Sequence, residues 1–181
     1  MRVGADYRRR SLCTFCFSLY NRTLSPILQR LGDVLVIIFF GFVPVGGTYY
    51  VQALTWTPDV TVASLVCGLL IDTLLVVNNY RDREADARSG KQTIIVRFGE
   101  KFGRYFYLAL GITASLLCLR FLSEGHFYAG LLPQLYLIPH FFTWKKMVRI
   151  YNGKKLNNIL GETSRNMLLM GVLLSLGLLL G

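Results

Sequence analysis

The sequence predicts an all-α membrane protein with about five transmembrane helices. Hydrophobic residues make up 53% of the 181 positions, and the mean hydropathy is +0.44. An ordinary soluble domain has roughly 45–50% apolar residues even when glycine is counted. The apolar residues gather in five runs, each near the roughly 20 residues that cross a bilayer. Because a backbone in lipid must satisfy its own hydrogen bonds, these runs are predicted to be helices.

Two short connections and two longer basic segments, residues 80–104 and 145–165, join the five predicted helices. The helices cover, in order, residues 33–54, 60–79, 105–122, 127–144 and 166–181. Pro44 lies in the first run, and Pro133 and Pro139 lie in the fourth. Proline removes a backbone donor and kinks a helix, which a membrane bundle tolerates. We therefore expect kinks in the first and fourth helices.

Residues 1–30 differ from the rest of the chain. They combine a basic start with an apolar stretch of about ten residues, the length of a signal-peptide core, but no clean cleavage site follows. We interpret residues 1–30 as a basic N-terminal tail at the cytoplasmic surface and residues 31–181 as the membrane domain.

The formal net charge is +10, and the cations alternate between the segments that connect the apolar runs. Six Lys/Arg precede the first run, none separates the first two, seven follow the second, one follows the third and six follow the fourth. The positive-inside rule then predicts a multi-pass protein with a cytoplasmic N-terminus. Cations between apolar runs suit anionic lipid headgroups. Because no nucleic-acid-binding motif is recognisable, we predict no nucleic-acid partner.

The stretch NNYRDREADARSGKQTIIVRFG, which begins at Asn78, directly follows the second apolar run. Charge at such a position is costly in a membrane, so we expect it to have a function. If the second helix continues past the membrane surface at 100° per residue, Asp72, Asn79 and Asp86 fall within about 40° of one another. Asp82 lies beside them. We expect this face to point into the bundle, toward a water-accessible cavity.

Asp82 and Asp86 have the i, i+4 spacing that brings two carboxylates together on a helix. Hard oxygen ligands suit Mg²⁺, which binds one or two carboxylates together with waters and substrate phosphates. Cations near in sequence would hold the remaining charge of a diphosphate; they are Arg81, Arg83, Lys91 and Arg97. The pattern favours a magnesium–diphosphate site at the membrane surface, suited to an amphiphile such as a prenyl diphosphate.

Other interpretations of the cluster stay open at this point. Alternating charges such as RDREAD also occur on solvated helix faces with internal ion pairs. A proton or ion pathway would explain Asp72, which lies deeper in the second run. A CDP-alcohol phosphotransferase also uses intramembrane aspartates and metal, but its D-G-x-x-A-R…G-x-x-x-D-x-x-x-D pattern is absent from the sequence.

The same stretch resembles the second aspartate-rich motif of the UbiA superfamily of intramembrane aromatic prenyltransferases. Its D-x-x-x-D, formed by Asp82 and Asp86, is followed by G-K-x-T and R-F-G. The resemblance is greatest to the menaquinone branch, the 1,4-dihydroxy-2-naphthoate polyprenyltransferases, and runs from about Leu31 to Gly181. It implies that residues 31–181 are the C-terminal part of a UbiA-type nine-helix bundle.

The resemblance implies transfer of a polyprenyl group from polyprenyl diphosphate to 1,4-dihydroxy-2-naphthoate. The naphthoate loses its carboxyl group, so the products are demethylmenaquinone, CO₂ and diphosphate. Asp82 and Asp86 would bind the Mg²⁺ cofactor, which helps the diphosphate to leave. The diphosphate would be held by amides and cations: Asn78, Asn79, Arg81, Arg83, Lys91 and Arg97. The implied location is the bacterial inner (plasma) membrane, with the lipid bilayer, polyprenyl diphosphate and an aromatic acceptor as partners.

The chain departs from the family in one respect. The family has two aspartate-rich motifs on opposite sides of one cavity, whereas this sequence has one such motif and about five apolar runs. We therefore expect the chain to be the C-terminal portion of a longer enzyme, completed by a missing N-terminal half or by self-association. The alternative is a truncated, non-catalytic membrane fragment with half of the metal–diphosphate site.

Overall fold

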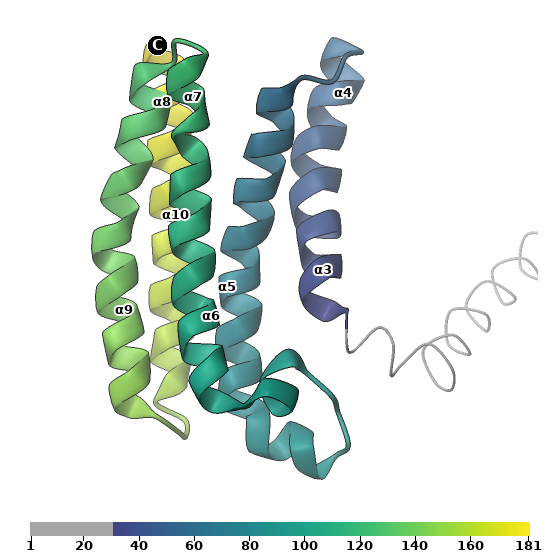
Figure 1. The fold of residues 1–181 in the computed structure, drawn as a ribbon, viewed down its shortest axis with the longest axis vertical. Coiled ribbons are helices and arrows are strands. Elements are labelled where there is room, and N and C mark those ends of the chain that lie inside the picture. Colours follow the sequence, from purple (N-terminus) through teal and green to yellow (C-terminus); the bar gives the residue numbers. More distant parts are fainter. Residues whose placement is uncertain (1–30) are drawn as a thin grey trace, which may run out of the picture.

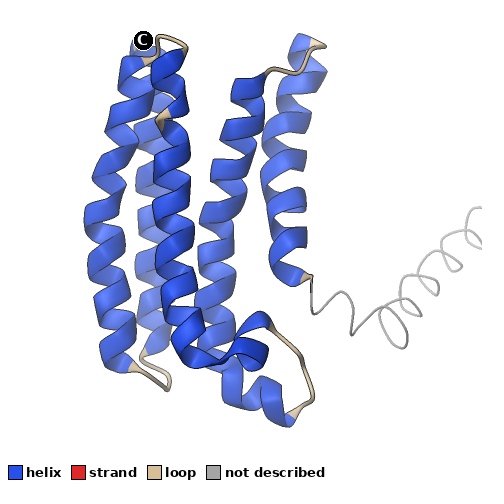
Figure 2. Ribbon diagram, in the orientation of Figure 1, coloured by secondary structure: helices blue, strands red, loops and turns tan. Residues whose placement is uncertain are grey.

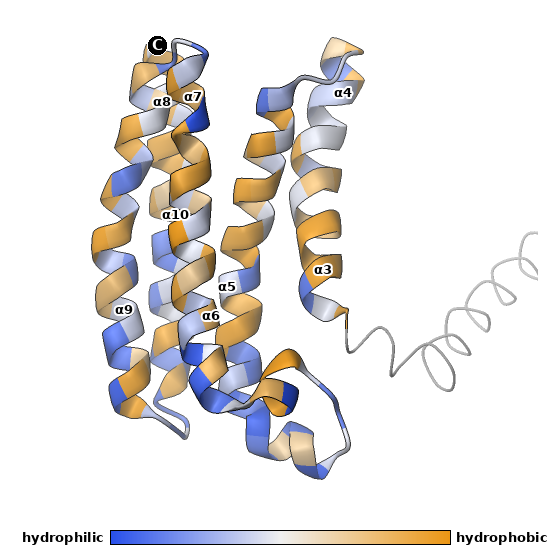
Figure 3. Cartoon of the chain, viewed as in Figure 1, coloured by the Kyte–Doolittle hydropathy of each residue, from blue (hydrophilic) through white to orange (hydrophobic). Residues whose placement is uncertain are grey.

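The computed structural model describes residues 31–181 as helices joined by short connections, with no β-strand among these residues (Figures 1 and 2). The predicted all-α membrane fold is confirmed, because four helices in this part of the chain are long and apolar enough to cross a bilayer. Residues 1–30, the predicted basic tail, lie outside the described residues. The helices run along a common axis, and hydrophilic residues gather at the end of the bundle where α5 gives way to α6 (Figure 3).

The first membrane-length rod has three consecutive segments: α3 (Gly32–Val36), η1 (Ile37–Gly46) and α4 (Gly47–Ala53). η1 has a π-helical pattern and contains Pro44. Proline lacks the amide that would bond the carbonyl four residues earlier, here that of Phe40. The Cys67 thiol of the next helix donates to this carbonyl oxygen, with a sulfur–oxygen distance of 3.6 Å. Pro44 therefore accompanies a change in helix winding and does not end the rod.

α5 (Pro58–Arg88) is the longest helix in the described part of the chain. The Thr57 hydroxyl caps it by accepting from the Val60 amide at 3.3 Å, and Pro58 lies in the first turn, where its missing amide removes no helical bond. At 1.5 Å per residue the helix extends about 46 Å, whereas the hydrocarbon core is about 30 Å thick. The prediction that the second helix continues past its apolar run is confirmed, and its last turns carry Asp82 and Asp86.

α5 and the first rod approach each other closely at two glycines. A Cβ added to Gly68 would lie 2.9 Å from Ile37 Cα, and one added to Gly41 would collide with the carbonyl oxygen of Ser64. Small residues allow membrane helices to make such backbone contacts. Few other residues in the range 31–181 pack against this rod, since only 11% of its most apolar stretch is buried.

We therefore expect Gly68→Ala to destabilise the pairing of α5 with the first rod by about 1–3 kcal/mol, since the added methyl group overpacks a backbone contact. Thermal unfolding in lipid nanodiscs measures the effect. Gly47→Ala is the matched control, because a Cβ at Gly47 meets nothing within 4 Å. Equal melting temperatures for the two variants would contradict the proposed packing role of Gly68.

A glycine-containing turn connects α5 to α6 (Ile94–Cys118). Gly90 has a φ of 78°, a left-handed conformation that favours glycine. The Thr93 hydroxyl then caps α6 by accepting from the Val96 amide at 3.3 Å. Gly99, with a φ of 84°, interrupts α6 after its first turns. The short first part therefore lies across the end of the bundle, and the longer second part runs along it and ends in α7 (Arg120–Ser123) (Figure 1).

The fourth predicted helix consists of three segments: α8 (Phe127–Leu131), η2 (Leu132–Tyr136) and α9 (Leu137–Ile150). The interruption that the prolines predicted is present, and this segmented rod is not among the four helices within residues 31–181 that are long and apolar enough to cross a membrane. Pro133 lies in the first turn of the 3₁₀ segment η2. The Gln134 side-chain amide donates to the carbonyl oxygens of Gly130 and Ser115, both at 2.9 Å. The bond to Ser115 connects the 3₁₀ segment η2 to α6.

α10 (Leu156–Leu180) begins well before the predicted start at residue 166. Its first turns are polar, whereas its later turns pack against α8 and α5. Two buried clusters hold the helices together. One lies nearer the hydrophilic end and includes Val77, Tyr80, Tyr107, Met147 and Ile159; the other includes Val66, Leu70, Ala114, Phe121, Tyr136 and Met170.

Candidate functional site

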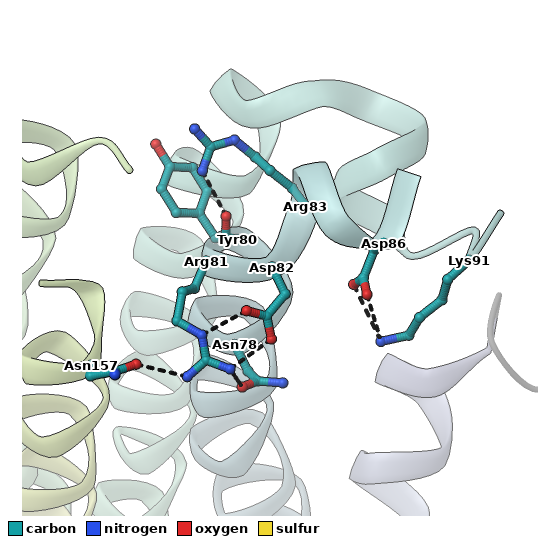
Figure 4. A network of polar contacts seen from close by, with 8 residues as sticks. All are labelled: Asn78, Tyr80, Arg81, Asp82, Arg83, Asp86, Lys91 and Asn157. Carbon is teal, nitrogen blue, oxygen red and sulfur yellow. Dashed lines mark hydrogen bonds and ion pairs between the residues drawn. The ribbon is translucent and has the colours of Figure 1, made fainter. Parts of the chain in front are cut away.

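The predicted site residues lie in the last turns of α5, in the turn that follows it and in the first part of α6; most of them are drawn in Figure 4, together with Asn157 of α10. The predicted inward face is confirmed in part, because Asp72, Asn79 and Asp86 are all buried, with exposed fractions of 0%, 5% and 9%. Asp82 is more open, with 37% of its side chain exposed. The last turns of α5 therefore present one carboxylate toward the surface and one toward the interior.

Arg81 connects three partners with one guanidinium group (Figure 4). Its Nε and Nη2 donate to the two oxygens of Asp82 at 2.7 and 2.6 Å, a bidentate ion pair. Nη2 also donates to Asn78 Oδ1 at 2.7 Å, and Nη1 donates to Asn157 Oδ1 of α10 at 2.9 Å. Arg81 therefore fixes the orientation of the Asp82 carboxylate and ties α5 to the start of α10.

Asp86 has a separate cation. Lys91 Nζ lies 3.2 and 3.4 Å from the two Asp86 carboxylate oxygens. The turn around Gly90 brings Lys91 back over the end of α5, and the Lys91 amide donates to the Asp86 carbonyl oxygen at 2.9 Å. Figure 4 shows this pair on a different side of the helix from Arg81 and Asp82. Each motif carboxylate thus has a neighbouring side-chain cation in this structure.

Arg83 points away from both carboxylates. Its Nη1 donates to the Tyr80 carbonyl oxygen at 2.7 Å, and its Nη2 lies 3.5 Å from Glu100. The guanidinium carbon lies 4.5 and 5.0 Å from the ring centroids of Tyr80 and Tyr151. In this conformation, Arg83 joins α5 to α6 and to the end of α9.

Arg97 and Asn79 lie outside the contacts drawn in Figure 4. Arg97 is exposed and lies over Phe98, with 5.5 Å from its guanidinium carbon to the ring centroid. Asn79 is buried on the inward face of α5. The predicted set of eight residues is therefore divided, and the structure brings together Asn78 with Arg81 and Asp82, and Asp86 with Lys91.

Asn157 is a member of the network that sequence reasoning missed. It precedes the fifth predicted run, in a stretch too polar to be counted as part of a membrane helix. The structure begins α10 at Leu156, and this places Asn157 beside Arg81. In the sequence, the one feature that could have indicated this role is the pair of amides in LNN, residues 156–158.

Asp72 faces another carboxyl group. Asp72 and Asp33 of α3 are both buried, with 0% and 9% of the two residues exposed, and neither Asp72 carboxylate oxygen has a hydrogen-bond partner within residues 31–181. The two hollows that α5 helps to line include neither residue. The expectation that Asp72 faces a water-accessible cavity therefore stays a prediction. Two carboxyl groups buried in an apolar span repel each other when both are ionised, so this pair is costly in the structure.

This arrangement predicts different effects for two substitutions of Asp72. Asp72→Asn removes one of the two buried carboxyl groups and supplies an amide that can donate to Asp33, so we expect little loss of stability. Asp72→Leu leaves Asp33 buried without this partner and is expected to cost about 1–3 kcal/mol. Thermal unfolding of both variants in nanodiscs tests the difference. A leucine variant as stable as the asparagine variant would mean that the pair does not stabilise the α3–α5 contact.

The residues present have the right chemistry for Mg²⁺ but do not form a complete protein cage. No group of three or more His, Cys, Asp or Glu side chains within residues 31–181 is arranged to hold a metal ion. Mg²⁺ commonly uses one or two carboxylates and takes its other ligands from water and substrate phosphates. Asp82 and Asp86 meet that requirement, with Asn78 as a neighbouring oxygen donor.

An apolar hollow of about 770 Å³ lies between α5, η1 and α10. Its walls include Val66, Leu70, Met167 and Leu174. The hollow lies several turns from Asp82, on the membrane side of the polar network, since residues 66–70 precede Asp82 by three to four helical turns. An amphiphile with a charged head at Asp82 would therefore find apolar surface deeper in the bundle.

The family model for the UbiA prenyltransferase family matches residues 12–160, which is most of the chain. The chain belongs to the UbiA prenyltransferase family. The resemblance of the aspartate-rich stretch to this family is thereby confirmed. The matched range begins within the N-terminal segment and ends in the first turns of α10.

Among the relatives of this UbiA-family chain is the 1,4-dihydroxy-2-naphthoate octaprenyltransferase of Haemophilus influenzae, which is 35% identical over 83% of the chain and 49% of the relative. The Escherichia coli protein of the same name is 37% identical over 60% of the chain and 34% of the relative. The human UbiA prenyltransferase domain-containing protein 1 is 27% identical over 90% of the chain and 46% of the relative. The chain thus spans about half or less of these relatives. No solved structure matches it significantly.

Proposed function

We propose that this UbiA-family chain takes part in the transfer of a polyprenyl group from polyprenyl diphosphate to 1,4-dihydroxy-2-naphthoate. The carbon–oxygen bond between the prenyl group and diphosphate breaks, a carbon–carbon bond to the ring forms, and the ring loses its carboxyl group as CO₂. The direct product is the quinol, which molecular oxygen oxidises to the quinone, demethylmenaquinone, during extraction. The observation that carries the proposal is the Asp82–Asp86 pair with its flanking cations, at the polar end of a membrane helix in a UbiA-family chain.

The network supplies groups that suit an anionic head. Arg81 and Lys91 neutralise the two carboxylates in the structure, and both cations remain partly exposed, with 26% and 39% of their side chains accessible. We infer that a diphosphate attracts these cations, so that they bind its oxygens and leave the carboxylates available to metal. Arg97, on the first part of α6, would contact the far side of the head.

Asp82 and Asp86 would hold Mg²⁺, with Asn78 and Asn79 as nearby amides. When bound, the metal stabilises negative charge that develops on the departing diphosphate. The protein's part is to orient the two carboxylates on one helix and to keep the head at the membrane surface. The prenyl tail would extend from the head toward the apolar hollow between α5 and α10, which would take its far end.

Arg83 is assigned a positioning role in this proposal. Its guanidinium group is held by the Tyr80 carbonyl oxygen, by Glu100 and by two aromatic rings. These contacts compete with any binding of Arg83 to diphosphate. We therefore expect Arg83 to support the shape of the site by fixing α5 against α6.

We place the chain in a bacterial inner membrane, with the network at the cytoplasmic face. The support is the gathering of hydrophilic residues at one end of the bundle (Figure 3) and the bacterial origin of several relatives. The lipid bilayer and both substrates are then its partners.

A second candidate is a non-catalytic membrane protein with half of a metal–diphosphate site. Two observations favour it: the chain spans about half or less of its curated relatives, and residues 31–181 contain no cluster of three potential metal ligands. In this case a separate polypeptide or a second copy would supply the remaining ligands.

The deciding experiment is an assay of the 181-residue chain in nanodiscs with Mg²⁺, octaprenyl diphosphate and 1,4-dihydroxy-2-naphthoate, with product measured by mass spectrometry. Product that disappears with EDTA supports the enzyme proposal for the chain itself. Product formed only after co-expression of the remaining part of a relative supports the half-site. No product under either condition overturns the proposed function.

A further inference from the structure

A small polar groove lies between α9 and α10, apart from the aspartate network. Its volume is about 250 Å³. α9 contributes Phe142, Thr143 and Lys146 to its walls, and α10 contributes Glu162, Arg165 and Asn166. Lys146 and Arg165 at its rim are exposed, so the groove opens on the surface.

The groove carries a net positive charge. Lys146 Nζ lies 2.8 Å from Glu162 Oε1, so these two charges offset each other. Arg165 is exposed and has no ion pair with any residue in the range 31–181. Lys146 also keeps 56% of its side chain exposed, and three donors on its ammonium allow it to bind a second acceptor. Two cations are thus available to one anion.

The floor of the groove is polar and ordered. Asn166 is buried, and its Nδ2 donates to Thr143 Oγ1 at 2.9 Å. Thr143 Oγ1 in turn donates to Glu162 Oε2 at 3.3 Å. These bonds fix Asn166, Thr143 and Glu162 relative to one another. The charged rim therefore stands on a base that is formed without any ligand.

The same helix faces become apolar farther from the polar end. On α10, Leu169 follows Arg165 at i, i+4 spacing and is 38% exposed. Leu135, on the α9 side of the groove, is 52% exposed. A charged recess followed by exposed apolar side chains matches an amphiphile, with its head at the recess and its tails along the helices.

The groove also lies at the right depth for a lipid headgroup. Asn157, at the start of α10, contacts Arg81 beyond the apolar run of α5. Glu162 lies five residues farther along α10, about 7–8 Å toward the membrane. The groove therefore lies close to the level at which the apolar run of α5 ends, where the phosphates of a bilayer leaflet would meet the protein.

We propose that the α9–α10 groove binds the phosphate of an anionic phospholipid through Lys146 and Arg165. The acyl chains lie along the apolar faces of α9 and α10. The lipid thereby holds the two helices together at the end of the bundle where α10 contacts the aspartate network. This binding does not depend on the proposed prenyl transfer.

The test uses the 181-residue chain in nanodiscs of phosphatidylcholine with and without phosphatidylglycerol. After extraction in mild detergent, native mass spectrometry counts the lipids that stay bound. We expect the wild-type chain to retain phosphatidylglycerol in preference to phosphatidylcholine by about tenfold or more. Arg165→Gln should reduce this preference severalfold, and Arg165→Gln with Lys146→Gln should abolish it.

The matched control is Lys145→Gln with Arg149→Gln. It removes the same charge from exposed positions on α9 that do not line the groove. If the control loses as much of the phosphatidylglycerol preference as the groove variants, the effect is one of general charge and the proposal is overturned. Groove variants that keep the full preference would also overturn it. Melting temperatures in pure phosphatidylcholine confirm that each variant is folded, and Arg165→Gln avoids leaving Glu162 unpaired.

A further arm separates a lipid from a free anion. Inorganic phosphate at millimolar concentration is added to the chain in phosphatidylcholine nanodiscs. We expect no change in melting temperature, whereas phosphatidylglycerol raises it. Stabilisation by inorganic phosphate alone that is lost in Arg165→Gln would assign the groove to a soluble phosphate and overturn the lipid assignment.

Discussion

Asp82→Asn and Asp86→Asn are each expected to reduce Mg²⁺-dependent prenyl transfer by at least about 10²-fold. Removing one group that stabilises transition-state charge usually has an effect of this size. Asparagine keeps the shape of each side chain but removes the negative charge that a hard metal ion requires. The measurement is product formation at saturating substrates, in whichever form of the protein is active in the proposed assay.

Binding provides a second measurement that does not need turnover. Mg²⁺-dependent binding of a non-reactive prenyl thiodiphosphate to the chain in nanodiscs should weaken in both variants. Glu84→Gln is the matched control, because Glu84 is an exposed carboxylate on the same turns of α5 and contacts Asn152, outside the Asp82 and Asp86 pairs. Near-normal transfer and binding in both aspartate variants would refute the site assignment.

Arg81→Gln is the second change with a large expected effect, on the order of 10- to 100-fold in product formation. Arg81 makes the bidentate pair with Asp82 and also contacts Asn78 and Asn157. The substitution removes a planar donor group that orients the carboxylate and suits phosphate. Arg81→Lys should restore only part of the activity, since an ammonium group cannot form the same fork of hydrogen bonds.

The control for Arg81 is Arg88→Gln, which removes an exposed cation from the same helix. Its activity should stay within about twofold of the wild type. A double-mutant cycle with Asn157→Leu then measures the coupling between α5 and α10, because neighbours in one network are not additive. Fully additive effects of Arg81→Gln and Asn157→Leu would show that the bond between the two side chains contributes nothing to function.

Several features of the fold were predictable from local sequence. The long apolar runs fixed most of the helices, and the seven-residue spacing of Asp72, Asn79 and Asp86 indicated the inward face of α5. The start of α10 was not predictable from hydropathy, because its first turns contain Asn157, Glu162 and Arg165. Asn157 bonds to Arg81 of α5 and Glu162 bonds to Lys146 of α9, and hydropathy does not detect such bonds between helices.

The fourth rod shows the same limit of local patterns. Pro133 and Pro139 predicted kinks, and the structure contains a change to 3₁₀ winding around Pro133. The Gln134 side-chain amide donates to the Gly130 carbonyl oxygen in the same rod and to the Ser115 carbonyl oxygen in α6. The choice between a kink and a rewound segment thus depends on a partner from another helix.

The sequence by itself determined the membrane class, the helical secondary structure and the aspartate-rich stretch, because each depends on composition or on spacing within one helix. The tertiary structure alone decided which cation each carboxylate meets: Asp82 faces Arg81, Asp86 faces Lys91, and Arg83 turns away to Tyr80 and Glu100. The physical reason is that long charged side chains have many rotamers, and the packed structure selects among them: Arg81 also donates to Asn157 of α10, and Arg83 lies beside Glu100 of α6.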